Sequence, residues 1–234
     1  ESFGMNVVLK EGYSATAPDL SSLVTKLKRS RPDVVLHTGY NPDITLLLRQ
    51  AKEQGLRFKA LIGHGAGYGV PDKLYEALGN DVDYIFNVDP VSIWLLDPKT
   101  LAKGLPAVTT KVGVEYQKAK PDMKVKSAAL GQGASNAFVF FDDVLPRAIK
   151  KYGGIDADSL RKAAMDTDIA AGGTLLGYGV KFPKEGESDM MGQNMRASPV
   201  VMQYIDRKVY IAWPKELQTI DPVLPLPESS VYSK

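Results

Sequence analysis

The sequence predicts an α/β fold, a Rossmann-like doubly wound parallel sheet. Between Asn6 and Val88, short apolar runs alternate with segments whose apolar residues recur at helical spacing. Turn and cap residues such as Gly55 and Gly79 mark where several of these segments end. Strands that alternate with helices form parallel sheets, because each helix carries the chain back across the sheet to begin the next strand.

The stretch from Asp33 to Gly69 shows this alternation most clearly. Val34 to Leu36 is a continuous apolar run, typical of a parallel strand that is covered on both faces. The helix that follows begins with Asn41-Pro42-Asp43, an N-cap, a first-turn proline and an acid at the positive end of the helix dipole. A second apolar run, Phe58 to Ile62, predicts the next strand.

The other expected elements of this part precede and follow that crossover. They are a strand at Asn6–Leu9, a helix capped by Asp19, a helix at Val70–Leu78 and a strand at Tyr84–Val88.

Beyond residue 106 the pattern changes to long helices and then to hairpins. Helices are expected at about Ala107–Lys120, after the sequence GQGASN, and at Asp158–Met165. Pro146 should remove a backbone hydrogen bond inside the long second helix and bend it. Val200–Ile205 and Lys208–Trp213 predict a β-hairpin, and the proline-rich tail is expected to run extended over the surface.

The composition is that of an ordinary globular chain. With 234 residues, 44% hydrophobic and 24% charged, the chain is long enough for one large domain or two modest ones. The net charge of +2 gives no reason to expect nucleic acid or a membrane surface as a partner. No apolar run approaches the length of about 20 residues that direct membrane insertion requires.

No feature of the sequence points to catalysis, a metal or a cofactor. Cysteine is absent, which removes thiol chemistry and cysteine-ligated metals. The two histidines, His37 and His64, lie on different strands with no carboxylate pair beside them. Asp142 and Asp143 are expected on the exposed side of a helix, where adjacent residues point about 100° apart, so they make a poor acid/base pair. We therefore expect a protein that is not an enzyme and has no cofactor.

The order of the motifs resembles a known family. A strand is followed by "Y…APDLSSLVTKLKRSRPDVVLHTGY", "LLLRQAKEQGL", "LIGHGAGYG", the long helix "ASNAFVFFDDVLPRAIKKYGG" and finally "PVVMQYIDRKVYIAWP". This order is similar to that of the substrate-binding proteins of ABC transporters of the branched-chain amino acid (Leu/Ile/Val-binding) type. The resemblance covers nearly the whole chain and implies the periplasmic-binding-protein type I fold, in which a ligand is held between two lobes.

The resemblance also implies a domain plan. Residues 1–122 would form the second, Rossmann-like lobe without its first strand and helix, and residues 123–183 would be a return segment of the first lobe. Residues 184–234 would return to the second lobe and end in the tail. On this plan the first lobe is mostly missing, so the chain is expected to be a C-terminal fragment whose N-terminal portion, including any signal peptide, lies outside it.

The expected ligand site lies at the carboxyl ends of the strands, where open α/β sheets bind their ligands. Tyr40 matches the position at which the family places an aromatic residue against the ligand, and Thr38 and Gly39 flank it. The alternative is a tyrosine that only covers the edge of the sheet.

Two further groups complete the expected site. The loop after the second strand contributes His64, Gly65, Ala66 and Tyr68, although the acidic residue that the family commonly has there is missing. This loop does not fit the dinucleotide motif G-x-G-x-x-G, because the position of the third glycine is Tyr68 or Val70. Gln132, Ser135 and Asn136 open the long helix and could hold a carboxylate, although Ser135 could equally be a helix cap.

The resemblance implies an extracytoplasmic, periplasmic solute-binding component of an ABC importer. Its expected partners are a small organic solute and an ABC permease in the membrane. The solute would be a branched-chain or related amino acid or, given the missing acidic residue, an aromatic or other carboxylic acid. The alternatives are a ligand-sensing regulatory domain of the same fold and, more remotely, a cytosolic α/β enzyme.

Overall fold

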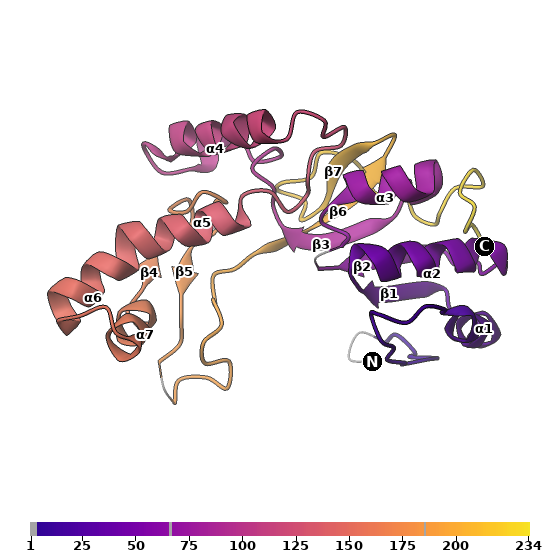
Figure 1. Ribbon diagram of the computed structural model, residues 1–234, viewed down its shortest axis with the longest axis horizontal. Coiled ribbons are helices and arrows are strands. Elements are labelled where there is room, and N and C mark those ends of the chain that lie inside the picture. Colours follow the sequence, from indigo (N-terminus) through magenta and orange to yellow (C-terminus); the bar gives the residue numbers. More distant parts are fainter. Residues whose placement is uncertain (1–3, 66, 185) are drawn as a thin grey trace. The chain divides into compact units, whose positions relative to one another are not determined.

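Figure 1 shows the protein as a computed structural model, which describes residues 4–65, 67–184 and 186–234. The chain divides into two units. Unit 1 consists of Glu1–Asp89, Met123–Ala128 and Val200–Lys234, and unit 2 consists of Pro90–Asp122 and Ala129–Pro199. This division differs from the domain plan, because residues 90–122 group with unit 2 rather than with the segment before them. The assignment of segments to two lobes stays a prediction.

Unit 1 is built on a sheet that, in the described residues, has five strands in the order β1-β2-β3-β6-β7. β1, β2 and β3 are parallel, and β6 and β7 form an antiparallel hairpin. The predicted α/β fold and the predicted hairpin are confirmed. The strands are β1 (Val34–Thr38), β2 (Ala60–His64), β3 (Phe86–Pro90), β6 (Pro199–Ile205) and β7 (Lys208–Trp213).

Three helices accompany the first strands. α1 (Ser21–Ser30) precedes β1, α2 (Asn41–Glu53) links β1 to β2, and α3 (Pro71–Leu78) lies between β2 and β3. α2 lies along the parallel strands in Figure 1 and buries the stripe Ile44, Leu47, Leu48 and Ala51, which recurs at helical spacing. This stripe contributes to the core of unit 1, and the short connection from Thr38 to Asn41 places the N-terminus of α2 at the carboxyl end of β1.

Two expectations at the start of unit 1 are wrong. Residues 6–9 belong to no strand, and Val7 and Val8 are about half exposed. Val35 is buried, whereas Val34 is 42% and Leu36 is 72% exposed, so β1 is covered on one face only. The reason is the strand order, in which β1 is an edge strand and pairs with β2 alone.

The C-terminal tail is part of the core of unit 1, which corrects the expectation of a surface segment. Tyr232 is fully buried, stacks on Phe58 with ring centroids 5.4 Å apart, and donates its hydroxyl to the carbonyl of Leu48 at 3.0 Å. Leu226 is also buried, and Lys234 forms an ion pair with Asp33. The tail therefore holds α2 and the region before β2 together.

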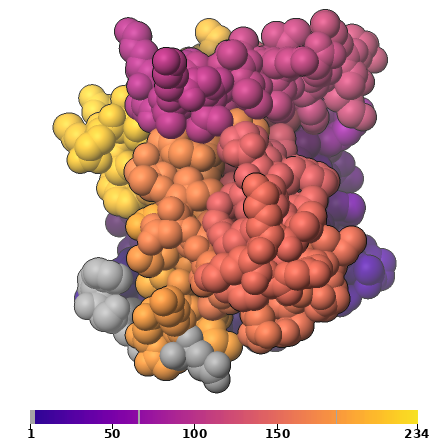
Figure 2. Space-filling view, turned by 90° about the vertical axis from the view of Figure 1, so that its left-hand side faces the viewer, coloured from indigo at the N-terminus to yellow at the C-terminus, as the bar shows by residue number. Residues whose placement is uncertain are grey.

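Unit 2 consists mainly of helices. The helices are α4 (Leu105–Ala119), α5 (Gln132–Val139), α6 (Leu145–Tyr152) and α7 (Ala157–Met165), with two short antiparallel strands, β4 (Asp168–Ile169) and β5 (Val180–Lys181). Figure 2 faces the surface where α5 to α7, in salmon, lie beside the orange segment that contains β5. No helix in the described ranges is long and apolar enough to cross a membrane.

The long helix that contains Pro146 is interrupted as the proline requires. A π-helical turn, Phe140–Val144, joins α5 to α6, and the amide of Leu145 donates to the carbonyl of Phe140. Proline cannot donate the bond that the i–4 carbonyl would accept, and a wider turn just before it accommodates this loss. The predicted disruption at Pro146 therefore takes the form of a π turn between two α-helical segments.

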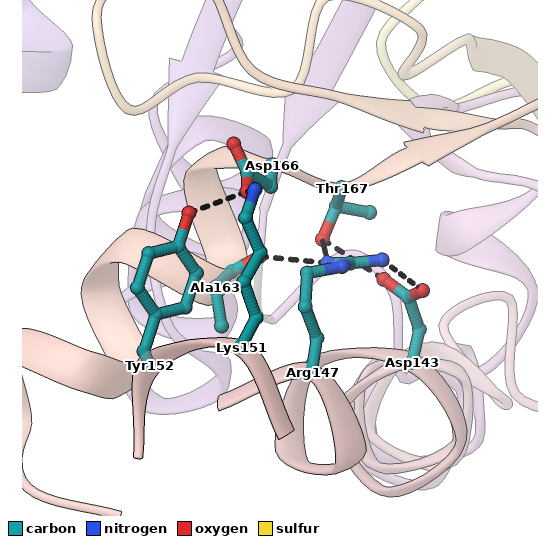
Figure 3. A network of polar contacts seen from close by, with 7 residues as sticks. All are labelled: Asp143, Arg147, Lys151, Tyr152, Ala163, Asp166 and Thr167. Carbon is teal, nitrogen blue, oxygen red and sulfur yellow. Dashed lines mark hydrogen bonds and ion pairs between the residues drawn. The ribbon is translucent and has the colours of Figure 1, made fainter. Parts of the chain in front are cut away.

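A network of polar contacts fastens α6 to α7 (Figure 3). Arg147 forms an ion pair with Asp143 and donates to the carbonyl of Ala163 at 2.7 Å, and Thr167 donates to Asp143 at 3.0 Å. Asp143 was expected on the exposed side of the helix and is instead half-buried, because Arg147 draws it against α7. One turn further, Asp166 accepts hydrogen bonds from Lys151 and Tyr152.

The buried tail predicts a large effect of one C-terminal substitution. We expect Tyr232→Ala to lower the free energy of unfolding by about 3–5 kcal/mol, the range for truncating a buried aromatic side chain. Tyr232→Phe keeps the ring and loses one hydrogen bond, so it should cost about 1 kcal/mol. Urea unfolding followed by circular dichroism measures both, and equal stabilities of Tyr232→Ala and the parent protein would contradict the packing described.

Candidate functional site

The carboxyl ends of β1, β2 and β3 lie side by side. Thr38 pairs with His64 across β1 and β2, and His64 pairs with Val88 across β2 and β3. The segments that follow these strands therefore start from one edge of the sheet. Tyr40 is 63% exposed there, and Thr38 and His64 are exposed as well.

A chain of hydrogen bonds joins four side chains behind this edge. Tyr13 donates its hydroxyl to a carboxylate oxygen of Asp43. The same hydroxyl oxygen lies 2.6 Å from Nε2 of His37, and the hydroxyl of Tyr68 lies 2.7 Å from Nδ1 of His37. The rings of Tyr13 and His37 are stacked, and Tyr68 meets His37 edge to face.

The direction of each bond follows from the proton inventory. An ionised carboxylate only accepts, so the proton of Tyr13 is used by Asp43, and His37 must donate from Nε2 to the oxygen of Tyr13. Nδ1 of His37 is then free to accept from Tyr68. The chain runs Tyr68 to His37 to Tyr13 to Asp43, with every proton directed toward the single negative charge.

The acid-base properties of the ring support this direction. Burial lowers the pKa of His37 to about 4, against the opposing effect of the nearby Asp43 carboxylate. His37 is therefore neutral at physiological pH, as a chain with one donating and one accepting ring nitrogen requires. Burial also raises the pKa of Tyr13 and of Tyr68, so both hydroxyls keep the protons that they donate.

Asp43 connects this chain to Tyr40. One oxygen of its carboxylate accepts from Tyr13, and the other accepts from the backbone amide of Tyr40 at 2.8 Å. Asp43 is only 2% exposed, so it is used inside the protein and is not presented to solvent. The carboxylate caps the first turn of α2 and fixes the backbone from which the exposed Tyr40 side chain projects.

Glycines bring the surrounding loops into contact with this chain. A Cβ on Gly63 would lie 2.3 Å from the ring of Tyr68, and a Cβ on Gly39 would lie 2.5 Å from the carboxylate of Asp43. A Cβ on Gly67 would meet Ile44 at 2.4 Å, and the amide of Gly67 donates to the carbonyl of Gly39 at 3.2 Å. The absence of side chains at these positions lets the loop after β2 close on the start of α2.

A hollow of about 460 Å³ opens beside these residues in unit 1. Its charged groups are the carboxylates of Glu11 and Asp43, and the first of these forms an ion pair with Lys26. The lining consists of Glu11, Gly12, Tyr13, Ala15, Leu36, His37, Thr38, Gly39, Tyr40 and Asp43.

The predicted site residues fall into distinct environments. Tyr40, Thr38 and Gly39 line the hollow, whereas Tyr68 is fully buried and is not among its lining residues. Tyr68 lies against Gly63 and supports His37 instead. His64 is exposed at the end of β2, Gly65 has a positive φ of 83°, and Ala66 lies outside the described residues.

The predicted residues of the long helix belong to unit 2. Ser135 is buried, Gln132 is half-buried and Asn136 is exposed on α5. No side-chain cap bond is made at the start of α5, so the helix-cap role of Ser135 is wrong. Contact of these three residues with a ligand stays a prediction.

Sequence reasoning missed Tyr13 and the partners of His37. The hydrogen-bond partners of His37 are the side chains of Tyr13 and Tyr68, which the sequence did not indicate. Asp43 stands three residues after Tyr40, the spacing at which an acid bonds back to the residue before a helix, and this signal was available. No local sequence pattern indicated the contact of Tyr13 with His37, because Tyr13 lies 24 residues earlier in the chain.

These features place the chain among proteins of known fold. A family model described as "Periplasmic binding protein" matches residues 1–198, and the chain belongs to this family. The parallel-rich α/β sheet is that of the type I members, as the sequence predicted.

Individual relatives give the same picture. The chain is 34% identical over 212 residues to the Leu/Ile/Val-binding protein homolog 7 of Brucella abortus, which covers 90% of this chain and 48% of that protein. A leucine binding protein LivK from Thermotoga maritima has a TM-score of 0.57 at 19% identity, covering 85% of this chain and 49% of that one. A fatty acid ABC transporter substrate-binding protein from Thermomonospora curvata has a TM-score of 0.56 at 16% identity, covering 91% and 51%. The chain thus spans about half the length of these relatives.

The buried histidine predicts a pH dependence of stability. The pKa of His37 is about 4 in the folded protein and 6.5 in the unfolded chain, so the unfolded state binds more protons between these values. The free energy of unfolding should therefore fall as the pH falls from 6.5 to 4, by up to about 1.4 kcal/mol per pH unit from this group alone.

The measurement compares variants by urea unfolding across this range. In His37→Gln the dependence between pH 4 and 6.5 should be shallower than in the parent protein. His64→Gln, which removes the exposed histidine, is the control for the loss of an imidazole. Identical slopes in the parent and in His37→Gln would show that His37 is not held neutral by the fold.

A second prediction concerns the contact between Gly63 and Tyr68. Gly63→Ala places a methyl group inside the Tyr68 ring, so we expect a loss of about 1–3 kcal/mol of stability, as for other overpacked cores. Gly133→Ala on α5 is the control, because a Cβ there meets no atom within 4 Å and alanine favours a helix. Thermal unfolding measures both, and equal Tm values for the two variants would contradict the contact.

Proposed function

We propose that this chain is part of an extracytoplasmic solute-binding component of an ABC importer. It would bind a small organic solute between two lobes and present it to a permease in the membrane. Membership in the periplasmic-binding-protein family and the similarity to a Leu/Ile/Val-binding protein homolog support the proposal. Closure would be a population shift, in which contacts of the solute with both lobes favour the closed state.

The observation that carries this proposal is that Tyr40 has an exposed side chain on a fixed backbone. Its side chain is 63% exposed at the carboxyl edge of a parallel sheet, where ligands of open α/β sheets bind. Its backbone amide is nevertheless fixed by Asp43. Asp43 accepts a hydrogen bond from Tyr13, and Tyr13 is in turn hydrogen-bonded to His37. An exposed aromatic ring on a rigid, internally satisfied support is suited to packing against a solute at low entropic cost.

The charges of the hollow narrow the class of solute. Carboxylates are the charged groups in its lining, and each oxygen of Asp43 already accepts an internal hydrogen bond. This surface offers no counter-charge to an acid, so the Tyr40 side would contact the apolar part of a solute. The carboxylate of an amino acid or of a carboxylic acid would be bound by groups outside this hollow.

The solutes named for two structural neighbours have both a carboxylate and an apolar portion. Leucine and a fatty acid each combine a carboxylate with an apolar portion, and these are the solutes in the names of the two structural neighbours. We therefore propose a solute of this kind: a branched-chain or related amino acid, or an aliphatic or aromatic carboxylic acid.

A thermal-shift screen tests the proposal. The protein would be screened against leucine, isoleucine and valine, medium-chain fatty acids, aromatic carboxylic acids and the corresponding amides, because a ligand that binds only the folded state raises Tm. We expect at least one acid with an apolar portion to raise Tm. Amides that raise Tm as much as their parent acids would exclude a carboxylate-binding group and overturn the solute class.

Titration calorimetry on variants tests the role of Tyr40. Tyr40→Ala should weaken the binding of the hit about 2- to 10-fold, the equivalent of the 0.5–1.5 kcal/mol of an aromatic contact. Tyr40→Phe should retain most of the affinity. Trp213→Ala is the matched control, since Trp213 is a similarly exposed aromatic residue on β7, the opposite edge strand. Unchanged affinity in Tyr40→Ala would remove Tyr40 from the site.

A further inference from the structure

The loop that precedes α1 is fastened to α2 at two points. At its start, Tyr13 donates to the carboxylate of Asp43 in the first turn of α2. At its end, the side chain of Gln50, two turns further along α2, accepts from the amide of Leu20 at 2.8 Å and donates to Asp19 at 2.6 Å. The residues between these points therefore bridge two fixed positions on one helix.

Short side chains leave a cavity under this bridge. The side chains of Ala15 and Ala17 end at Cβ, and the amide of Ala17 donates to the carbonyl of Ser14 at 2.9 Å, so the chain turns here. A cavity of about 320 Å³, which we call the Arg49 cavity, lies between this turn and α2. Both ends of the loop are held by α2, and the alanines between them do not fill the space.

One face of α2 forms the other wall of the cavity. The accessible residues of α2 in this wall are Pro42, Thr45, Leu46 and Arg49. Their spacing of three, four and seven residues places them on one side of the helix. The buried stripe that begins at Ile44 lies on another side, so this wall is not part of the core of unit 1. The wall combines apolar surface with one hydroxyl and one guanidinium group.

Arg49 is an unpaired cation at the surface of this cavity. Within residues 4–65, 67–184 and 186–234, its guanidinium forms no ion pair and no hydrogen bond, although Glu53 follows at the helical spacing of four residues. A guanidinium offers five donors in a planar fork that fits a carboxylate or another oxyanion. The cavity therefore has a group suited to binding an anion.

The second charged residue of the cavity restricts which anion fits. Asp43 also borders it, and each oxygen of this carboxylate already accepts an internal hydrogen bond. Asp43 and Arg49 are six residues apart, or about 9 Å along the helix axis. A dianion at Arg49 would be repelled by the charge of Asp43 more than a monoanion with an uncharged body. The charge pattern favours a monocarboxylate.

We propose that the Arg49 cavity is a binding site for a small monocarboxylate, whose carboxylate accepts from the Arg49 guanidinium and whose short apolar body packs against Ala17 and Leu46. The site is distinct from the hollow beside Tyr40. Ala15 and Asp43 border both cavities, whereas Tyr40 lines the hollow alone. The inference does not depend on which solute the hollow binds.

A titration of the whole chain with sodium propionate tests the proposal. Two-dimensional nitrogen-15 NMR would follow the amides of Ala15, Ala17 and Thr45 at constant ionic strength, with Gly39 as the reporter of the hollow. We expect saturable shifts at the first three amides with a Kd of about 1–10 mM, because an exposed ion pair contributes little binding energy. Propionamide, which lacks the charge, should give no saturable shift, and the dianion sulfate should bind more weakly than propionate.

Variants of Arg49 test its role as the anchor. Arg49→Gln keeps a polar side chain and removes the charge, so it should weaken propionate binding about 10-fold or more. Arg49→Lys keeps the charge without the planar fork, and its Kd should lie between the two. Arg29→Gln is the matched control, because it removes an equally exposed arginine from the neighbouring helix α1. The Kd of this control should equal that of the parent protein.

A second variant blocks the cavity and keeps its charge. Ala17→Leu adds three carbon atoms to the loop wall while Arg49 stays in place. Propionate should then cause no saturable shift at Thr45, and an unchanged circular dichroism spectrum would show that the chain is folded.

Four outcomes would overturn the proposal. They are the absence of saturable shifts in the parent protein, equal Kd values for the parent and Arg49→Gln, undiminished binding in a folded Ala17→Leu chain, and sulfate binding as tight as that of propionate, which would indicate an adventitious ion only. Tyr40→Ala separates this site from the proposed solute site. It should weaken the hit of the thermal-shift screen and leave the Kd for propionate at the Arg49 cavity unchanged, so the two proposals fail separately.

Discussion

The buried carboxylate of Asp43 is the interaction on which the candidate site depends. It is the one negative charge in a chain of four side chains, and each proton of the chain points toward it. An unpaired carboxylate at 2% exposure would be costly, and Tyr13 and the amide of Tyr40 offset that cost. Four segments are thereby tied together: the loop at Tyr13, the end of β1, the start of α2 that follows it, and the loop after β2.

The same hydrogen-bond chain explains why glycine, with no side chain, occupies positions 63 and 67. Tyr68 can reach His37 because Gly63 leaves room for its ring, and the loop after β2 can reach α2 because Gly67 has no side chain. Polar satisfaction and close packing are therefore one requirement here. As a result, the exposed side chain of Tyr40 projects from a backbone that the hydrogen bond to Asp43 holds in place.

The sequence predicted the elements of this protein better than their surroundings. Apolar periodicity located α2, α3 and the β6–β7 hairpin, since these patterns are local. It failed at Val34–Leu36, where an apolar run indicates a strand but does not reveal whether an edge position leaves one face open. It also failed at the tail, because proline content does not show that Tyr232 finds a place against Phe58. In the site, the position of Tyr40 was predicted, while the Tyr13–His37 contact was not, because it is a long-range contact without a local pattern.

The segments of unit 1 have a consequence for the order in which the protein folds. β6, β7 and Tyr232 lie in Val200–Lys234, yet they complete a unit whose first strand is made near residue 34. Contacts such as Tyr232 to Leu48 span 184 residues, so their loop-closure entropy must be overcome late in folding. The segment that forms most of unit 2 lies between β3 and its second neighbour β6, so unit 1 cannot be completed before Val200–Lys234 has been made. The β6–β7 hairpin and Tyr232 are therefore the parts of unit 1 on which its completion waits, although its first strands lie near residue 34.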